Sequence, residues 1–331
     1  MSKPKIALYW CSSCGGCEES IVDLAEDILT VISSAEIVFW PVALDFKYED
    51  LNRFSDGEID AALINGAIRM SEQEQIVKLL RRKSKLIIAQ GACAHLGGVV
   101  GLANFNAKKE ILERAYKKVP TLKNDAGVFP QMKVWQDDME LDLPDFHKIV
   151  KPLDMVIDVD YYIPGCPPPP ELIKSALLAV LENKLPQKGT VLAEKKALCE
   201  SCSRRDTKPN KIKIKRFKRV YETELDENKC FLDQGVICLG IATRGGCNER
   251  CIKANQPCKG CFGPVDNVLD YGGKVLSAIA SMIDYDTPEE LEAILSSIPD
   301  LAGLFYRYSL ASSILKMKLN KDKNNAQEDN D

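Results

Sequence analysis

Short apolar runs alternate with amphipathic stretches along the first 190 residues of the chain. The apolar runs have the length and content of buried strands, and they cover residues 5–10, 36–40, 60–65, 85–90 and 155–159. Between them, the spacing of apolar residues and helix-start signals predict helices over residues 21–32, 71–82, 107–118 and 170–185. Strands that alternate with helices favour a doubly wound parallel α/β sheet of the flavodoxin-like kind.

The pattern changes beyond this region. Pro186 to Gly189 reads as a boundary, and a stretch rich in cysteine and glycine follows it as far as Pro264. Helical spacing then returns, with helices predicted from Pro288 and from Leu301, and the polar end from Asn320 is predicted to be disordered. We therefore expect a flavodoxin-like domain at residues 1–188, a small cysteine-rich module at 189–265 and a helical tail at 266–331.

Eight of the thirteen cysteines lie in the predicted module, which is typical of a metal-binding segment. They begin with the C-x-x-C pair C-E-S-C and end with the pair C-K-G-C, and glycines between them allow a tight backbone. Eight thiolates divide into two sets of four, the number that holds one 4Fe-4S cluster or one tetrahedral zinc ion. The eight are Cys199, Cys202, Cys230, Cys238, Cys247, Cys251, Cys258 and Cys261.

The other cysteines follow the ends of three predicted strands. In a parallel sheet these loops leave at one edge, where open α/β folds bind ligands, so Cys14, Cys17, Cys93 and Cys166 are expected to converge. The bland interpretation of Cys93 and Cys166 is that each is a small buried hydrophobe. We prefer the ligand interpretation because both lie in tight Gly/Pro loops. Cys11 is left over as a thirteenth cysteine.

Composition limits the classes of partner. The chain has 44 basic and 48 acidic residues and a net charge of −4, which does not favour binding to nucleic acid or to an anionic membrane. No apolar run approaches the ~18 residues of a membrane span, and the first apolar run is too short for the core of a signal peptide. We expect a cytoplasmic protein, in which clustered cysteines indicate metal or redox chemistry more often than disulfides.

Zinc competes with iron as the metal of these sites. The paired spacings in the module suit two zinc ions with four thiolates each. A third structural zinc would be needed at the sheet edge, in a domain large enough to fold without one. Iron-sulfur clusters would give all three groups a common purpose in electron transfer.

Three motifs in chain order resemble those of nickel-iron hydrogenase small subunits. C-G-G-C-E-E (Cys14 to Glu19) matches C-x-G-C-x-E, G-A-C-A-H-L-G-G (Gly91 to Gly98) matches G-x-C-x-x-x-G-G, and P-G-C-P-P-P-P (Pro164 to Pro170) matches P-G-C-P-P. The small electron-transfer subunit of respiratory complex I shares the last motif, but its first motif has adjacent cysteines, which this chain lacks.

The resemblance implies three 4Fe-4S clusters. Cys14, Cys17, Cys93 and Cys166 would hold the proximal cluster, and Glu19 matches the motif's glutamate. The module would be ferredoxin-like and hold two clusters. In sequence order, its distal ligands would be Cys199, Cys202, Cys230 and Cys238, and its medial ligands would be Cys247, Cys251, Cys258 and Cys261. Such modules can exchange a ligand between clusters, so this division is open.

Differences from the family's common motifs indicate which branch of the family the chain resembles. Cys199 stands where membrane-linked members have a histidine, and Cys251 supplies a fourth medial thiolate. The chain is therefore most similar to the cytoplasmic methyl-viologen-reducing, heterodisulfide-reductase-linked hydrogenases of methanogens. Related members often have an acidic residue before the glycine of the third strand's loop, where this chain has Asn65 and Gly66.

The resemblance implies a subunit without catalytic residues of its own. The nickel-binding motifs R-x-C-G-x-C and D-P-C-x-x-C do not occur in the chain, so H2 oxidation would lie on a large-subunit partner. Electrons would pass to an iron-sulfur acceptor subunit and on to heterodisulfide reductase. The alternatives are a hydrogenase that reduces a deazaflavin, a pyridine nucleotide or a sulfur compound, and a zinc scaffold. The basic stretch Lys208 to Arg219 is either a solvated loop or a docking surface for an acidic acceptor.

Overall fold

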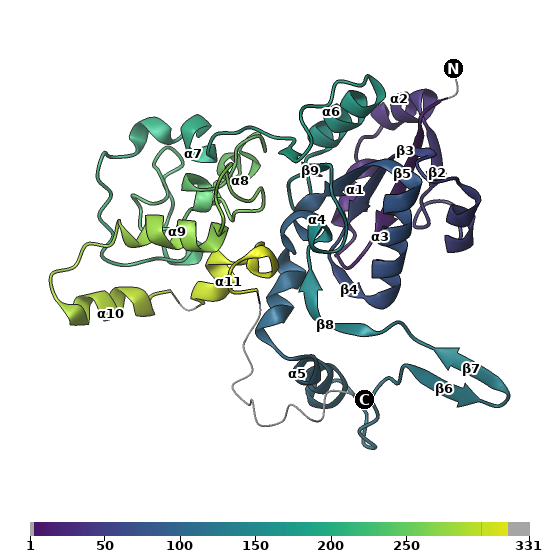
Figure 1. Ribbon diagram of the computed structural model, residues 1–331. Helices are drawn as coiled ribbons and strands as arrows, with labels where there is room; N and C mark the ends of the chain where they lie inside the picture. Colours follow the sequence, from purple (N-terminus) through teal and green to yellow (C-terminus); the bar gives the residue numbers. More distant parts are fainter. Residues whose placement is uncertain (1–2, 299, 317–331) are drawn as a thin grey trace.

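The computed structural model describes residues 3–298 and 300–316, and a six-stranded parallel sheet forms the centre of one half of the molecule (Figure 1). Its order is β2-β1-β3-β5-β9-β10. Numbered along the chain, this is the flavodoxin-like order 2-1-3-4-5 with one more strand, so the predicted fold class is confirmed. The strands are β1 (Lys5–Trp10), β2 (Glu36–Phe39), β3 (Ile59–Asn65), β5 (Ser84–Gln90), β9 (Tyr161–Ile163) and β10 (Thr190–Val191).

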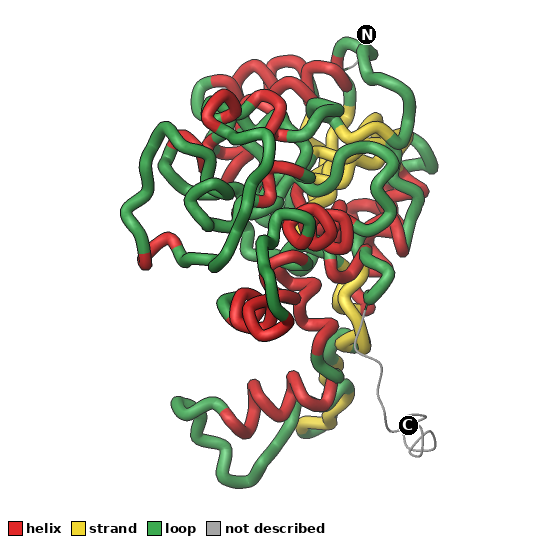
Figure 2. Tube along the Cα trace, turned by 90° about the vertical axis from the view of Figure 1, so that its left-hand side faces the viewer, coloured by secondary structure: helices red, strands yellow, loops and turns green. Residues whose placement is uncertain are grey.

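Helices cover both faces of this sheet (Figure 2). On one face, α3 (Ser71–Lys83) buries Ile76, Val77 and Leu80 against alternate strand residues. On the other face, a second apolar cluster includes Ile21 and Ile173. The helices of that face are α1 (Gly16–Val22), α2 (Asp27–Ser34) and α6 (Pro170–Leu181). Each strand thus alternates between two cores, as a sheet buried on both faces requires.

The helix expected over residues 21–32 is two helices. Ala25 adopts a φ of 50°, a left-handed conformation that ends α1 and turns the chain before α2 begins. Leu29 and Ile32, expected on the buried face, are 65% and 47% exposed. The prediction of one continuous helix was wrong, because the helical spacing of apolar residues continues through the turn whereas the helical backbone conformation is interrupted there.

The strand expected at 155–159 begins later, as β9. Leu153 and Ile157 instead enter the core from a short 3₁₀ turn. Pairing with β5 starts at Asp160, whose N–H donates to the Ile87 carbonyl at 2.9 Å while its carboxylate accepts the Ile87 N–H at 2.8 Å. The apolar run at 155–159 therefore did not mark the position of β9, because the side chains of this region fill the core from a turn that precedes the strand.

A long excursion between β5 and β9 forms an arm. It contains α4 (Gly91–Leu96), α5 (Lys108–Glu113), β6 (Lys133–Gln136), β7 (Met139–Asp142) and β8 (Phe146–Lys151), and β8 pairs with β4 (Ile68–Met70). The β6–β7 hairpin projects away from the body (Figures 1 and 2). One of its faces is apolar and 44% to 63% exposed, and it consists of Met132, Val134, Met139, Leu141 and Leu143. This hairpin was not predicted.

The other half of the molecule has a core of its own. Leu232, Leu239, Tyr271, Val275 and Phe305 are buried together there. Its helices are α7 (Leu198–Ser201), α8 (Arg250–Lys253), α9 (Tyr271–Ala280), α10 (Pro288–Ser296) and α11 (Leu301–Phe305). The helix predicted from Pro288 is confirmed, whereas α9 was missed. The division at residues 188 and 265 stays a prediction, and β10 adds two residues beyond 188 to the sheet.

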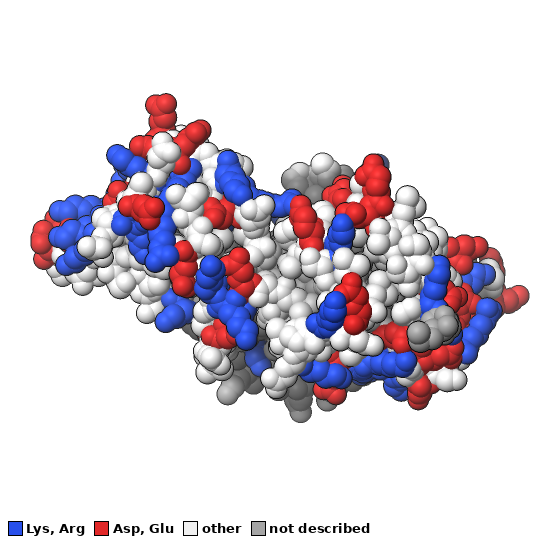
Figure 3. All heavy atoms as spheres, turned by 90° about the horizontal axis from the view of Figure 1, so that it is seen from above, with Lys and Arg blue, Asp and Glu red and all other residues white. Residues whose placement is uncertain are grey.

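The remaining expectations concern surface charge, membrane-spanning segments and the end of the chain. On the face in Figure 3, lysine and arginine side chains are interspersed with acidic ones. None of the helices in the described part of the chain has the length and apolar content that a membrane span requires. The predicted disorder from Asn320 lies outside the described residues.

Asp160 joins α3, β5 and the end of the sheet. Its carboxylate accepts hydrogen bonds from Arg81 and Lys188, each at 2.6 Å, besides the one from the Ile87 N–H. Burial alone would raise the pKa of Asp160, but the hydrogen bonds outweigh it and lower the pKa below its ordinary value. The carboxylate therefore stabilises the fold in its ionised form.

We expect Asp160→Asn to lower the free energy of unfolding by about 1.5–3 kcal/mol at neutral pH, because hydrogen bonds to a charged group are lost. The stabilisation is present above the unfolded-state pKa of about 4 and is lost as the pH falls through the lowered folded-state pKa. Denaturant unfolding against pH would therefore show the two proteins converging in acid. Asp158→Asn, at an exposed neighbour, is the matched control, and an equal loss there would contradict this account.

Candidate metal sites

Three loops bring four cysteines together at the edge where the parallel strands end. Cys14 and Cys17 follow β1, Cys93 lies in α4 after β5, and Cys166 follows β9. The charges of Cys93, Cys166 and Cys14 all act on the Cys17 thiol, which places the four side by side. We call these four residues the sheet-edge set.

Backbone contacts hold these loops against one another. The Ala92 N–H donates to the Gly165 carbonyl at 2.6 Å, and the Gln90 side chain donates to the Cys17 carbonyl at 2.9 Å. Gly91 has a φ of 85°, and a Cβ there would collide with the Cys17 sulfur. A glycine is therefore required where the second loop passes the first.

Burial opposes ionisation of the sheet-edge thiols. Cys17 and Cys93 are buried, and burial, followed by the charges of Cys166 and Cys14, raises the pKa of Cys93 to about 12. Neighbouring thiolates would repel one another, so they require a cation to balance their charge. Four convergent thiols thus fit an iron-containing group or a zinc ion by their donor chemistry. Cys14 and Cys166 are exposed and give the set an open side.

A second group of four cysteines lines a cavity of about 330 Å³ next to the sheet edge. Its wall includes Cys166 of the sheet-edge set and the prolines that follow it. Burial raises the pKa of Cys258 and of Cys261 to about 12, and the charge of Cys166 raises the pKa of Cys261 further. We call the group the middle set, and it consists of Cys247, Cys251, Cys258 and Cys261.

The remaining four cysteines line a second, mostly apolar cavity. Phe231, Leu232 and Ile241 form much of its wall, and the Arg204 guanidinium stacks over the Phe231 ring at 4.0 Å. The Cys258 N–H of the middle set donates to the Cys238 sulfur at 3.4 Å, so the two cavities adjoin. We call the group the outer set, and it consists of Cys199, Cys202, Cys230 and Cys238.

The three sets thus lie in a row, from the sheet edge through the middle set to the outer set. The cysteines group around cavities in the sequence-order division that was expected for the module. Across the described part of the chain, no three His, Cys, Asp or Glu side chains are arranged to hold one metal ion. The ligand roles of the twelve cysteines stay a prediction.

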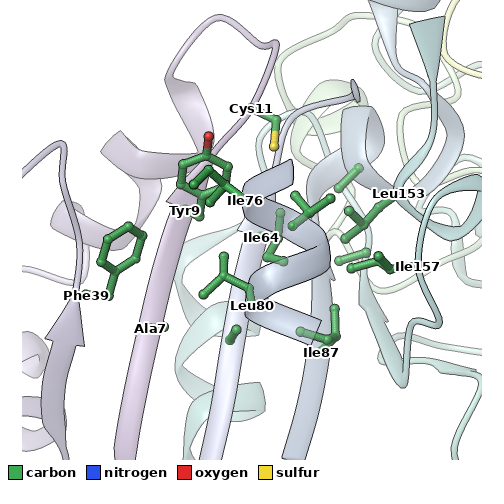
Figure 4. Close-up of a cluster of buried hydrophobic side chains, with 14 of the residues drawn as sticks. Ala7, Tyr9, Cys11, Phe39, Ile64, Ile76, Leu80, Ile87, Leu153 and Ile157 are labelled. Carbon is green, nitrogen blue, oxygen red and sulfur yellow. The ribbon is translucent and has the colours of Figure 1, made fainter. Parts of the chain in front are cut away.

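Cys11 is a core residue. It is 4% exposed and points into the apolar cluster with Tyr9 and Ile64, as Figure 4 shows. Burial is the only cause that raises the pKa of its thiol, whereas the thiols of the sheet-edge set also act on one another. The structure therefore sets it apart from the other twelve cysteines.

Glu18 is the polar residue that the motif search missed. It is 5% exposed, and its carboxylate accepts hydrogen bonds from the Trp40 indole and from the Asn65 amide, both at 2.6 Å. Glu19, which matches the motif, is exposed. Asn65 therefore acts as a donor to a neighbouring carboxylate where related chains often have an acid. The motif's spacing selects Glu19, and nothing in the sequence indicates that Glu18 is the buried one of the two adjacent glutamates.

The basic stretch is partly built into the second half of the molecule. Ile212, Ile214 and Phe217 are buried in its core, and the lysines between them face outward. Lys213 lies 3.0 Å from the Asp284 carboxylate and Lys215 lies 4.0 Å from it. The alternation follows that of an edge segment, with apolar side chains inward and charged ones in solvent.

Comparisons with known proteins agree with this architecture. Residues 14–180 match the family described as NADH ubiquinone oxidoreductase, 20 Kd subunit. The chain is 40% identical to the iron-sulfur subunit of the F420-non-reducing hydrogenase of Archaeoglobus profundus, over 96% of this chain and 99% of that one. It is 35% identical to the corresponding subunit of the F420-non-reducing hydrogenase of Methanothermobacter thermautotrophicus, over 97% and 98%.

A solved structure shows a similar fold. It is the recombinant NiFeSe hydrogenase from Desulfovibrio vulgaris Hildenborough in the oxidized state, with a TM-score of 0.51 and 16% identity. The match covers 81% of this chain and 95% of that one, so it extends beyond the sheet into the cysteine-rich half.

We expect Glu18→Ala to destabilise the protein by about 2–4 kcal/mol, because two buried N–H donors lose their acceptor and a small cavity opens. Thermal unfolding and near-UV circular dichroism would measure the loss. Glu19→Ala removes the same side chain from an exposed position and should change stability by less than about 0.5 kcal/mol. Equal effects of the two substitutions would refute the role of Glu18.

Proposed function

The chain belongs to the NADH ubiquinone oxidoreductase 20 Kd subunit family and, within it, to the iron-sulfur subunits of F420-non-reducing hydrogenases, and from this we propose that it is the electron-transfer small subunit of a nickel-iron hydrogenase. Three 4Fe-4S clusters would connect a large subunit that oxidises H2 with an acceptor subunit. The observation that carries the proposal is the unbroken row of three cysteine sets.

Each cysteine set would hold one cluster, with the sheet-edge set proximal, the middle set medial and the outer set distal. When bound, such clusters supply one-electron carriers with potentials between about −700 and +450 mV. The chain's own residues place the thiols, exclude water with apolar walls and donate backbone N–H groups to sulfur. Donors to Cys258 and Cys238, for example, come from the N–H groups of Gly260 and Gly240. These hydrogen bonds favour the thiolate form and would raise the potential.

The exposed side of the sheet-edge set would face the large subunit. Cys14 opens to the surface there, and Trp10 beside it is 37% exposed. The arm is also attached near this edge. Its last strand, β8, pairs with β4, and Ala67, just before β4, bridges to Ser12 in the Cys14 loop. Exposed apolar patches of this kind are typical of protein interfaces.

The outer set would face the acceptor subunit. The relatives are named F420-non-reducing, which excludes F420 as the acceptor of those proteins. We propose an iron-sulfur acceptor subunit linked to heterodisulfide reductase for this chain. Acceptors of other classes, a pyridine nucleotide or a sulfur compound, are the alternative. We propose a cytoplasmic location for the complex. Reduction of each candidate acceptor by the purified complex under H2 distinguishes them.

Anaerobic metal analysis of the complex tests the ligand assignment. We expect roughly 12 iron atoms per small subunit, in addition to any iron of its partners, and a loss of about four in Cys230→Ser. Cys11→Ser is the matched control and should keep all of its iron, because that thiol lies in the apolar core. If the analysis finds zinc but neither iron nor acid-labile sulfide, the result would instead support the zinc scaffold.

Substitutions in the arm test the contact with the large subunit. Val134 and Leu141 are cross-strand partners on the apolar face, and replacing both with serine should weaken association with the nickel-bearing subunit by at least about tenfold, since each buried aliphatic side chain contributes about 1.5–3 kcal/mol. Affinity can be measured by interferometry with tagged subunits. Lys133→Gln with Glu140→Gln alters the opposite face and should leave the affinity unchanged. Loss in both variants, or in neither, would contradict the proposed interface.

A further inference from the structure

A separate cavity of about 240 Å³ lies beside the cysteine sets and contains none of the cysteines. Its wall combines the end of the basic stretch, the C-K-G-C loop and the region around α11. Four cationic side chains line it, from residues far apart in the chain. They are Lys218, Arg219, Lys259 and Arg307.

These four cations have no acidic partner among the residues that the structure describes. Within residues 3–298 and 300–316, no carboxylate forms an ion pair with any of them, whereas Lys213 and Lys215 in the same basic stretch lie beside Asp284. The one acid in the wall is Asp300, and its carboxylate accepts the Gly303 N–H at 2.8 Å. The Arg307 Nε donates to the Gly303 carbonyl at 3.3 Å, which leaves its charge unbalanced. The lining thus carries four positive charges and one negative charge.

Lys259 is the most constrained of the four. It is half-buried, and it lines the same wall as the Arg307 guanidinium. Two cations that repel each other in a concave, partly desolvated site are stabilised by an anion between them. Apolar side chains of Val220, Ile298 and Leu304 complete the wall and suit the methylene groups of an acidic side chain.

The cavity lies close to the middle set and to the outer set of cysteines. Lys259 stands between Cys258 and Cys261 of the middle set, and Ile237 in the same wall precedes Cys238 of the outer set. A group seated here would therefore bring its own protein within reach of these cysteines. Fewer cations line the two cysteine-lined cavities, with Arg204 at that of the outer set and Arg250 and Lys259 at that of the middle set.

We propose that this cavity is the docking pocket for an acidic side-chain cluster, aspartate or glutamate, on the protein that accepts electrons from the chain. The proposal rests on the proposed function, because that function supplies the acceptor. Charge complementarity selects the occupant, since carboxylates neutralise the surplus that the described chain leaves open. Such pairing guides encounter and fixes orientation, and salt weakens it.

Calorimetry on the complex of the chain with its large subunit, purified without the acceptor, tests the pocket with an acetylated hexaglutamate peptide as the probe. Lys218→Glu with Arg219→Glu should weaken peptide binding by at least about tenfold, and wild-type binding should fall between about 50 mM and about 300 mM salt. Both residues are exposed, so the fold should tolerate the change. Lys213→Glu with Lys215→Glu changes the net charge equally, in the same stretch, and should retain binding to within about threefold.

The outcomes separate this proposal from the function on which it rests. Iron content and H2-dependent reduction of a small viologen dye report the electron route and should be the same in wild type and both variants. Equal peptide binding by wild type and Lys218→Glu/Arg219→Glu would overturn the docking pocket while leaving that route intact. Binding of inorganic phosphate that is lost in Lys218→Glu/Arg219→Glu, together with no binding of the peptide by wild type, would assign the cavity to a free anion and also overturn the proposal.

Discussion

The constraint on which this structure depends is the electrostatics of crowded, buried thiols. Burial raises the pKa of Cys93, Cys258 and Cys261 to about 12, and neighbouring sulfurs oppose ionisation further. Such groups can become thiolates together only when a cation balances them. The fold must therefore bring the thiols to shared cavities and supply N–H donors around them. Glycines at the crossing points and short loops in both halves of the molecule meet that requirement.

The parallel sheet solves the geometric part of this problem at one edge. All its strands end there, so loops far apart in sequence emerge side by side, and the Glu18, Trp40 and Asn65 hydrogen bonds tie the first of them to β3. The second half of the molecule has no such sheet among its described residues. It places its thiols around cavities through short helices and an apolar core, to which the basic stretch contributes Ile212, Ile214 and Phe217.

Several surface features make sense only in an assembly. The arm presents an apolar ribbon to solvent, and an isolated hairpin is marginally stable without a cover. At the other half, the cationic cavity leaves positive charge unbalanced. These two surfaces differ in chemistry, one apolar and one charged. Under the proposed function they would suit two unlike partners.

The sequence by itself determined the fold class and the family, because strand–helix alternation and Cys, Gly and Pro spacing are local properties, and it predicted the grouping of the cysteines into fours. It did not reveal the break at Ala25, the late start of β9 or the helix α9, since each depends on what the core accepts from a distant segment. Nor did it show that Glu18 rather than Glu19 is buried, or that Lys213 pairs with Asp284 while Lys218 has no ion pair within the described residues. Only the tertiary structure decided these, because burial and charge balance are set by neighbours that sequence distance conceals.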